Sequence, residues 1–159
     1  MCIRDSLVPL IMKKKYLSQE SVENYIHIIY SNIIESKWKP DIILSINRGG
    51  CIPGVYLSHY NSVAHKVLDF KDIDNTTIDL YKRILGDHKN ILVVDDINDT
   101  GETLSTISKY FNEYFPKIKY AVIIENKKSE FNVDFYGTQI DKSIDSSWIV
   151  FPWENNENG

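Results

Sequence analysis

The segment Ile91–Thr106, with the sequence ILVVDDINDTGETLST, decides the fold of this chain. It opens with four consecutive apolar residues and continues through two adjacent carboxylates, Asp95 and Asp96, to a third at Asp99. A continuous apolar run rich in β-branched residues is typical of a strand buried on both faces, as in a parallel sheet covered by helices. The segment is therefore predicted to begin as a buried strand that ends in an acidic loop.

A helix is predicted to follow this acidic loop. Residues 98–101, Asn-Asp-Thr-Gly, are typical of a turn, and Thr103 can cap a helix that runs from Leu104 to about Phe115. Its apolar residues recur at helical spacing, which places its aromatic rings in the core. In open α/β sheets, ligands bind beyond the carboxyl ends of the strands, and the acidic loop is predicted to lie there.

Strands and helices alternate along the rest of the chain. Further strands are predicted at residues 41–46, 64–70, 119–124 and 132–136, and helices at residues 18–35 and from about 51 to 60. Such alternation is typical of a single α/β domain with a mainly parallel, five-stranded sheet flanked by helices. Residues 71–90 are polar and show no clear period, so they are predicted to be a flexible loop. The alternative for a segment of this length is an element whose pattern is hidden.

Composition excludes several classes of function. The chain has 159 residues, 43% of them hydrophobic and 25% charged, which is ordinary for one globular domain. Its net charge of −4 gives no support for general binding to nucleic acid or to anionic membranes. No apolar run approaches the roughly 18–20 residues of a membrane span. Cys2 and Cys51 lie far apart and are predicted to be unpaired thiols in a reducing cytoplasm.

The two ends of the chain are predicted to lie outside the domain. Residues 1–12 carry a short apolar run with an acidic residue before it and lysines after it, an order that differs from a signal peptide. We expect these residues to be disordered or to be a non-native extension. The domain is predicted to span residues 13–154, and residues 155–159 are a polar tail.

The acidic loop has the chemistry of a site for a phosphorylated sugar. Successive backbone N–H groups at Asp99–Thr103, two threonine hydroxyls and a helix N-terminus would hold a phosphate monoester. Asp95 and Asp96 would repel phosphate, but they suit ribose hydroxyls or a hydrated Mg²⁺ ion. The alternative is a capped helix beside solvated carboxylates, which three carboxylates in five positions after a buried strand disfavour. Residues 47–50, Asn-Arg-Gly-Gly, follow another predicted strand and would bring backbone N–H groups close to an anion.

Three segments resemble the type I phosphoribosyltransferases, and within that family the bacterial xanthine–guanine (hypoxanthine) enzymes. The sequence ILVVDDINDTGET (91–103) is similar to their signature for phosphoribosyl pyrophosphate (PRPP). The sequence IILSINRGGCIPGVYLSHY (42–60) resembles their first strand, pyrophosphate loop and helix, and SSWIVFPWE (146–154) resembles the hood that covers the base. The resemblance extends over about residues 16–154. It implies the fold of that family, with a small hood and a flexible loop.

The resemblance implies that a purine base attacks C1′ of PRPP and releases pyrophosphate, which gives a purine nucleoside monophosphate in purine salvage. The base would be guanine, xanthine or hypoxanthine, and Mg²⁺ would be the cofactor. Asp99 would accept a proton near purine N7, and Asp96 would be the metal ligand. By the same resemblance, PRPP and its 5′-phosphate would be bound by Asp95, Asp96, Thr100, Gly101, Glu102 and Thr103, pyrophosphate by Arg48 and Gly49, and the purine by Trp148, Ile149 and Lys127.

Two departures from the family pattern leave the choice of base open. The family places a lysine just after the fifth strand to donate to the purine 6-oxo group. Direct register puts Asn126 at that place, and Lys127 is predicted to take the role. The flexible loop lacks the usual Ser-Tyr pair, and Lys82 or Arg83 would close over pyrophosphate.

Other functions stay open on the sequence alone. Another base such as adenine would be the acceptor if no lysine reaches the 6-position. A regulatory protein that senses PRPP is a further alternative, although such relatives usually need a basic face. An inactive paralogue is disfavoured because the acidic loop is intact. The resemblance also implies a homodimer or homotetramer, and the expected location is the cytoplasm.

Overall fold

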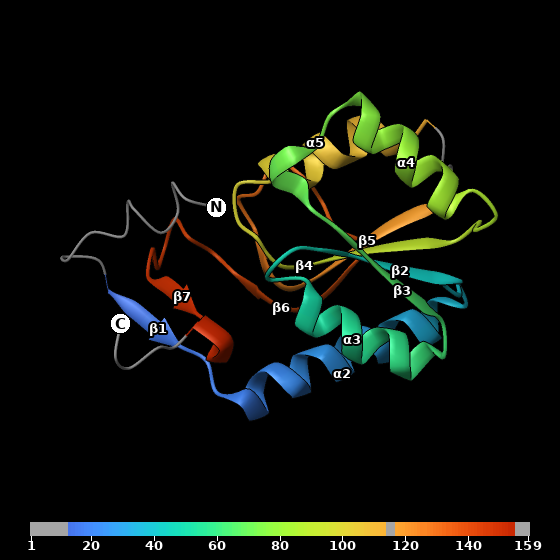
Figure 1. The fold of residues 1–159 in the computed structure, drawn as a ribbon. Helices are drawn as coiled ribbons and strands as arrows, with labels where there is room; N and C mark the ends of the chain where they lie inside the picture. The colour runs from blue at the N-terminus through green and yellow to red at the C-terminus, as the bar shows by residue number, and fades with distance from the viewer. Residues whose placement is uncertain (1–12, 114–116, 155–159) are drawn as a thin grey trace.

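The fold is built on one parallel sheet (Figure 1). The structure is a computed structural model, and it describes residues 13–113 and 117–154. The predictions for residues 1–12 and 155–159 lie outside the described residues. All neighbouring strands are parallel, which confirms the predicted sheet. Across the sheet, the order is β3 (Ala64–Leu68), β2 (Ile42–Ile46), β4 (Ile91–Asn98), β5 (Ile118–Asn126) and β6 (Phe135–Ile140).

Helices cover both faces of this sheet because its central strands are apolar on both sides. Alternate residues of a strand point to opposite faces. Accordingly, Leu92 and Val94 of β4 join one buried cluster, and Ile91 and Val93 join the other. The first cluster lies under α2 (Gln19–Ser36) and α3 (Cys51–Asn61), and the second lies under α4 (Asn75–Leu85) and α5 (Glu102–Phe111) (Figure 1).

Helix α2 follows its predicted pattern closely. The Ser18 hydroxyl accepts a hydrogen bond from the N–H of Ser21 at 3.1 Å and so caps the helix. Its apolar stripe is buried against the sheet through Val22, Ile26, Ile29 and Ile33. In the two described ranges, no helix is both long and apolar enough to cross a membrane.

A small second sheet forms the hood beside the main sheet (Figure 1). It pairs β1 (Lys14–Tyr16) with β7 (Trp148–Val150) in parallel, and a short 3₁₀ helix, η2 (Pro152–Glu154), follows. The N–H of Trp148 donates to the carbonyl of Lys13 at 2.7 Å. Ile149 and Phe151 are buried in the cluster under α2 and α3, which anchors the hood. Strand β1 was not predicted, because an exposed Lys-rich segment has strand geometry only through its partner.

The prediction of a flexible loop at residues 71–90 is wrong for most of that range. A 3₁₀ turn, η1 (Phe70–Asp72), leads into α4, in which Ile78 and Leu85 are buried. Helix α4 packs against the sheet through one narrow apolar stripe. Its polar residues therefore outnumber its apolar ones, which obscures the helical period in the sequence. Its N-terminus is capped by Asp74, whose Oδ1 accepts from the N–H of Thr77 at 2.7 Å.

Two details of the central segment also differ from the prediction. Strand β4 does not end at Val94 but continues to Asn98, because β5 pairs with it as far as Asn98 and Glu125. Helix α5 begins at Glu102 after Gly101, without a capping side chain, so Thr103 lies inside the first turn rather than at the cap. The helix ends at Phe111, and residues 114–116 lie outside the described residues.

The cap of α4 gives a test of this helix. Hydrogen bonds from Thr77 hold the pKa of Asp74 below its ordinary value. We expect Asp74→Ala to lower the melting temperature by about 2–4 °C at neutral pH. The difference should shrink, without vanishing, as the pH falls through the lowered pKa of Asp74, because a protonated carboxyl accepts more weakly than a carboxylate and then caps only as a neutral side chain does. Asp74→Asn, which can also cap, should stay close to wild type; an unchanged melting temperature in Asp74→Ala would contradict the cap.

Candidate active site

The predicted site residues gather at the carboxyl ends of the parallel strands. Asp69 follows β3, residues 47–50 follow β2, and the acidic segment ends β4. The pKa of the Cys51 thiol, at the start of α3, responds to carboxylates near these strand ends. Burial raises its pKa, and the carboxylates of Asp95 and Asp69 raise it further. The Cys51 thiol is therefore within the electrostatic influence of the carboxylates of Asp95 in β4 and Asp69 after β3.

Asp95 and Asp96 are adjacent residues near the carboxyl end of β4. Oδ1 of the half-buried Asp95 accepts a hydrogen bond from the N–H of Asp96 at 2.8 Å. Oδ1 of Asp96, which is 6% exposed, accepts from the N–H of Ile97 at 2.7 Å. Local backbone donors thus fix the direction of both carboxylates.

The loop after β2 packs against Asp96. A Cβ atom added to Gly49 would lie only 2.1 Å from Oδ2 of Asp96, so the backbone approaches the carboxylate more closely than any side chain would allow. The peptide bond between Asn47 and Arg48 is cis, and the Arg48 side chain is exposed. The structure therefore brings the predicted pyrophosphate loop and the predicted sugar-binding carboxylates together.

The two carboxylates fit a hydrated Mg²⁺ ion. Mg²⁺ is usually bound through one or two carboxylates and substrate phosphate oxygens, while it keeps several waters. Within residues 13–113 and 117–154, no group of three or more His, Cys, Asp or Glu side chains converges as a metal site. Asp95 and Asp96 would therefore hold such an ion only together with substrate oxygens and water.

The turn at Thr100–Thr103, the predicted phosphate site, has a constrained backbone. Gly101 has φ of 93°, a left-handed conformation that favours glycine, and it is buried against the backbone of Phe131 and Glu130. The N–H of Glu130 donates to the carbonyl of Thr100 at 2.9 Å, which braces the turn from the β5–β6 connection. The Glu102 side chain is exposed, as its position in a backbone-binding turn requires. The start of α5 adds the positive end of its helix dipole.

Asp99 is held by a residue for which the sequence gave no role. Nδ2 of Asn126, at the end of β5, donates to the carbonyl oxygen of Asp99 at 2.9 Å and to its Oδ1 at 3.3 Å. The side chain of Lys127 is exposed, and its N–H donates to the carbonyl of Ile140 at 2.8 Å. The only sequence signal for this contact is the register that put Asn126 in the place of the family's lysine.

A buried polar pair lies beneath the turn. Oε1 of Glu125 accepts from Nδ2 of Asn98 at 2.7 Å, and its Oε2 accepts from the N–H of Val133 at 3.2 Å. Asn98 Nδ2 also donates to the carbonyl of Phe131 at 2.6 Å. Burial raises the pKa of Glu125, while the donors Val133 and Asn98 oppose this rise. The pair ties β4 and β5 to the segment that braces Gly101, and an acidic residue at the end of an apolar strand is the signal that would have drawn attention to it.

The hood contributes the residues predicted to bind the base. Trp148 is half-buried and Ile149 is buried at 3% exposure. The ammonium of Lys142 lies 5.9 Å from the centroid of the Trp148 ring and donates to the carbonyl of Ser147 at 2.9 Å. Lys142 is thus a further cation at the hood, on the segment between β6 and β7, and the sequence interpretation did not include it.

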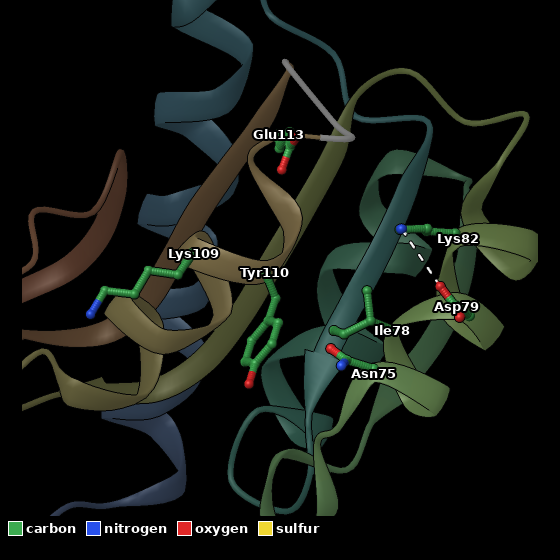
Figure 2. A pocket seen from close by; sticks show the side chains of 7 residues that line it. All are labelled: Asn75, Ile78, Asp79, Lys82, Lys109, Tyr110 and Glu113. Atoms are coloured by element: carbon green, nitrogen blue, oxygen red, sulfur yellow. Dashed lines mark ion pairs between the residues drawn. The ribbon is translucent and has the colours of Figure 1, made fainter.

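Lys82 of α4 lines a separate cavity of about 450 Å³ between α4 and α5 (Figure 2). Lys82 pairs there with Asp79 at 3.6 Å, and Lys109 and Tyr110 of α5 line the opposite side. This cavity adjoins the later turns of α5, whereas the anion turn adjoins its N-terminus. Lys82 is therefore placed on the flank of α5, and the closure of Lys82 or Arg83 over pyrophosphate stays a prediction.

Comparison with known proteins agrees with this geometry. The sequence matches the phosphoribosyl transferase domain family over residues 13–156. It is 28% identical to a purine phosphoribosyltransferase from Pyrococcus horikoshii, with a TM-score of 0.70 over 91% of this chain and 97% of that one. A hypothetical protein from Neisseria gonorrhoeae with bound ppGpp has 21% identity and a TM-score of 0.74, covering 92% of each chain. The xanthine-guanine-hypoxanthine phosphoribosyltransferase of Helicobacter pylori has 18% identity and a TM-score of 0.69, covering 92% of this chain and 96% of that one.

The chain belongs to the phosphoribosyltransferase family, with the type I fold. The two likenesses of lower identity show the fold alone. The protein is a glycosyltransferase that transfers a pentosyl group, and the family together with the P. horikoshii enzyme supports a purine as the acceptor.

The contact between Gly49 and Asp96 predicts the effect of one methyl group. Gly49→Ala should displace the Asp96 carboxylate and lower kcat/KM for phosphoribosyl transfer by roughly 10- to 100-fold, the scale of a misplacement near 1 Å. In an Asp96→Ala background, the same change should have little further effect, because the clashing carboxylate is absent. Equal losses in both backgrounds would show that Gly49 acts elsewhere.

Proposed function

We propose that the protein transfers the phosphoribosyl group of PRPP to a 6-oxopurine, namely guanine, xanthine or hypoxanthine, in purine salvage. The products would be a purine nucleoside monophosphate and pyrophosphate. The observation that carries this proposal is the arrangement of residues 95–103. Two directed carboxylates lie near the end of β4, Asp96 beside the glycine loop, and a braced helix start at Gly101 follows within a few residues. One segment thus offers ligands for a vicinal diol and for a phosphate.

Each part of PRPP has a matching group in this proposal. The 5′-phosphate would be bound by the turn Thr100–Thr103, mainly through backbone N–H groups. The ribose hydroxyls would be bound by Asp95 and Asp96. Pyrophosphate would meet the exposed Arg48 guanidinium and the N–H of Gly49, because planar guanidinium groups bind phosphate oxygens in pairs.

The negative charge of Asp95 and Asp96 has to be balanced before the anionic pyrophosphate group can bind nearby. Mg²⁺, held by Asp96 and substrate oxygens, would supply positive charge to the departing pyrophosphate. In this proposal, Asp95 and Asp96 would meet the sugar and the cation, and the 5′-phosphate would bind at the more distant turn. This separation would orient C1′ toward the base site, and positioning of this kind provides a large share of catalysis when a transition state is loosely bonded.

The reaction would replace one bond at C1′ by another. The bond from C1′ to the pyrophosphate oxygen breaks, its electron pair leaves with pyrophosphate, and a purine ring nitrogen forms the new bond. Asp99 would accept the proton that the purine loses near N7. Trp148 would stack on the purine, the Ile149 backbone would read its edge, and Lys127 would donate to the 6-oxo group.

A different base such as adenine is the second candidate. The observation that favours it is the position of Asn126, which stands in register with the family's lysine while its carboxamide is engaged with Asp99. If neither Lys127 nor Lys128, which are both exposed, reaches the base, no lysine directly after β5 donates to an oxo group. A PRPP-sensing regulator finds less support, because the net charge of −4 provides no basic face. Family resemblance supports a cytoplasmic homodimer or homotetramer.

A substrate panel tests this function. The protein is incubated with PRPP, Mg²⁺ and one of guanine, xanthine, hypoxanthine, adenine or uracil, and pyrophosphate release is measured. We expect release with at least one 6-oxopurine, and we expect a metal chelator to abolish it and added Mg²⁺ to restore it. Turnover with adenine alone would support the second candidate. No turnover with any oxopurine would reject the leading proposal.

The role of Asp99 makes a separate prediction. Asp99→Asn keeps the size of the side chain but removes the proton acceptor, so kcat should fall by about 10²–10⁴-fold. PRPP affinity, measured by titration calorimetry, should stay within a few-fold of wild type, because the turn that binds the 5′-phosphate is retained. Near-normal kcat in Asp99→Asn would mean that another group takes the proton.

A further inference from the structure

The buried carboxamide of Asn126 connects the catalytic loop to the hood. Asn126 is 6% exposed, and its Nδ2 donates to both the carbonyl and the carboxylate of Asp99. Its Oδ1 accepts from the N–H of Lys128 at 3.3 Å and from the N–H of Lys142 at 3.2 Å. A buried amide that is bonded on both its nitrogen and its oxygen has one orientation, which makes it suitable for fixing its neighbours.

Lys142 continues this connection to the aromatic residue of the hood. Its backbone is bound to Asn126, while its half-buried side chain reaches the Ser147 carbonyl at 2.9 Å and lies 5.9 Å from the Trp148 ring centroid. An ammonium at this distance attracts the face of an indole ring. One continuous set of contacts therefore runs from Asp99 through Asn126 and Lys142 to Trp148.

We propose that Asn126 is a positioning residue that acts through Asp99, and that Asn126 and Lys142 together set the place of Trp148 relative to Asp99. The inference rests on the proposed function, in which Asp99 takes the purine proton and Trp148 stacks on the purine. These two groups come from different parts of the chain, one after β4 and one in β7. A base stacked on Trp148 presents N7 to Asp99 only if both are fixed to within a fraction of an ångström.

The two ends of the carboxamide have separate consequences, which two variants distinguish. Asn126→Asp retains an oxygen for the N–H groups of Lys128 and Lys142, but it replaces the donor to Asp99 by a carboxylate oxygen that repels the Asp99 carboxylate. It should lower kcat by about 10- to 100-fold while KM for the purine stays within about twofold. Asn126→Leu keeps the volume but loses both ends, so it should lower kcat and also raise KM for the purine. Steady-state kinetics at about pH 8, where an aspartate is ionised, measure both constants.

The hood end is tested by Lys142→Met, which keeps the length of the side chain and removes the ammonium. KM for the purine should rise severalfold, and kcat should also fall, because a base stacked on a displaced Trp148 no longer presents N7 to Asp99. Asn132→Asp is the matched control for Asn126→Asp, because Asn132 is exposed on the same β5–β6 connection. It should leave both constants unchanged. Melting temperatures of all variants identify any loss of folded protein.

A double-mutant cycle decides whether Asn126 works through Asp99 or only supports the fold. In an Asp99→Asn background, Asn126→Asp should have little further effect on kcat, because the positioned carboxylate is already absent. A full additional loss in that background, or an unchanged kcat in Asn126→Asp alone, would overturn the inference. The assays use whichever purine the wild type accepts. Absence of turnover with every purine in the wild type would instead reject the proposed function.

Discussion

The site depends on the parallel pairing of β4 with β5. This pairing runs from Ile91 and Ile118 to Asn98 and Glu125, whereas the pairing of β4 with β2 ends at Ser45 and Val94. Beyond that point, one edge of β4 meets the loop after β2, and the other edge is still held by β5. The difference in length lets Gly49 approach Asp96 on one side and lets Asn126 reach Asp99 on the other.

A second constraint is that charged and polar groups at this end of the sheet are partly or fully buried. Four polar side chains at this end of the sheet are buried: Asp96, Asn98, Glu125 and Asn126. Burying a polar group lowers the stability of the fold unless the group is hydrogen-bonded. Each has a partner from the backbone or from a neighbouring strand. The result is a hydrogen-bonded polar cluster at the carboxyl ends of β4 and β5, beside the proposed substrate site. Such bonding fixes the positions of these side chains, and a transferase gains rate by holding two substrates in one geometry.

The order of elements was predictable because it follows from local patterns. The buried runs of β2 and β4, the Ser18 cap and the stripe of α2 each need only a few neighbouring residues to be recognised. Helix α4 was missed because only two of its residues are buried, and β1 was missed because its strand geometry comes from β7. The cap assigned to Thr103 was wrong because Gly101, in a left-handed conformation, starts the helix instead.

By itself, the sequence determined the parallel α/β fold and the family, and it is the source of the roles proposed for the segment from Asp95 to Thr103. These follow from residue types at fixed spacing and from the alternation of strands and helices along the chain. Only the tertiary structure decided that Asp96 faces Gly49, that Asn126 holds Asp99, and that Lys142 joins Asn126 to the Trp148 hood. The physical reason is that these contacts join side chains from different strands and loops. Their partners are set by strand length and register, which no local pattern records.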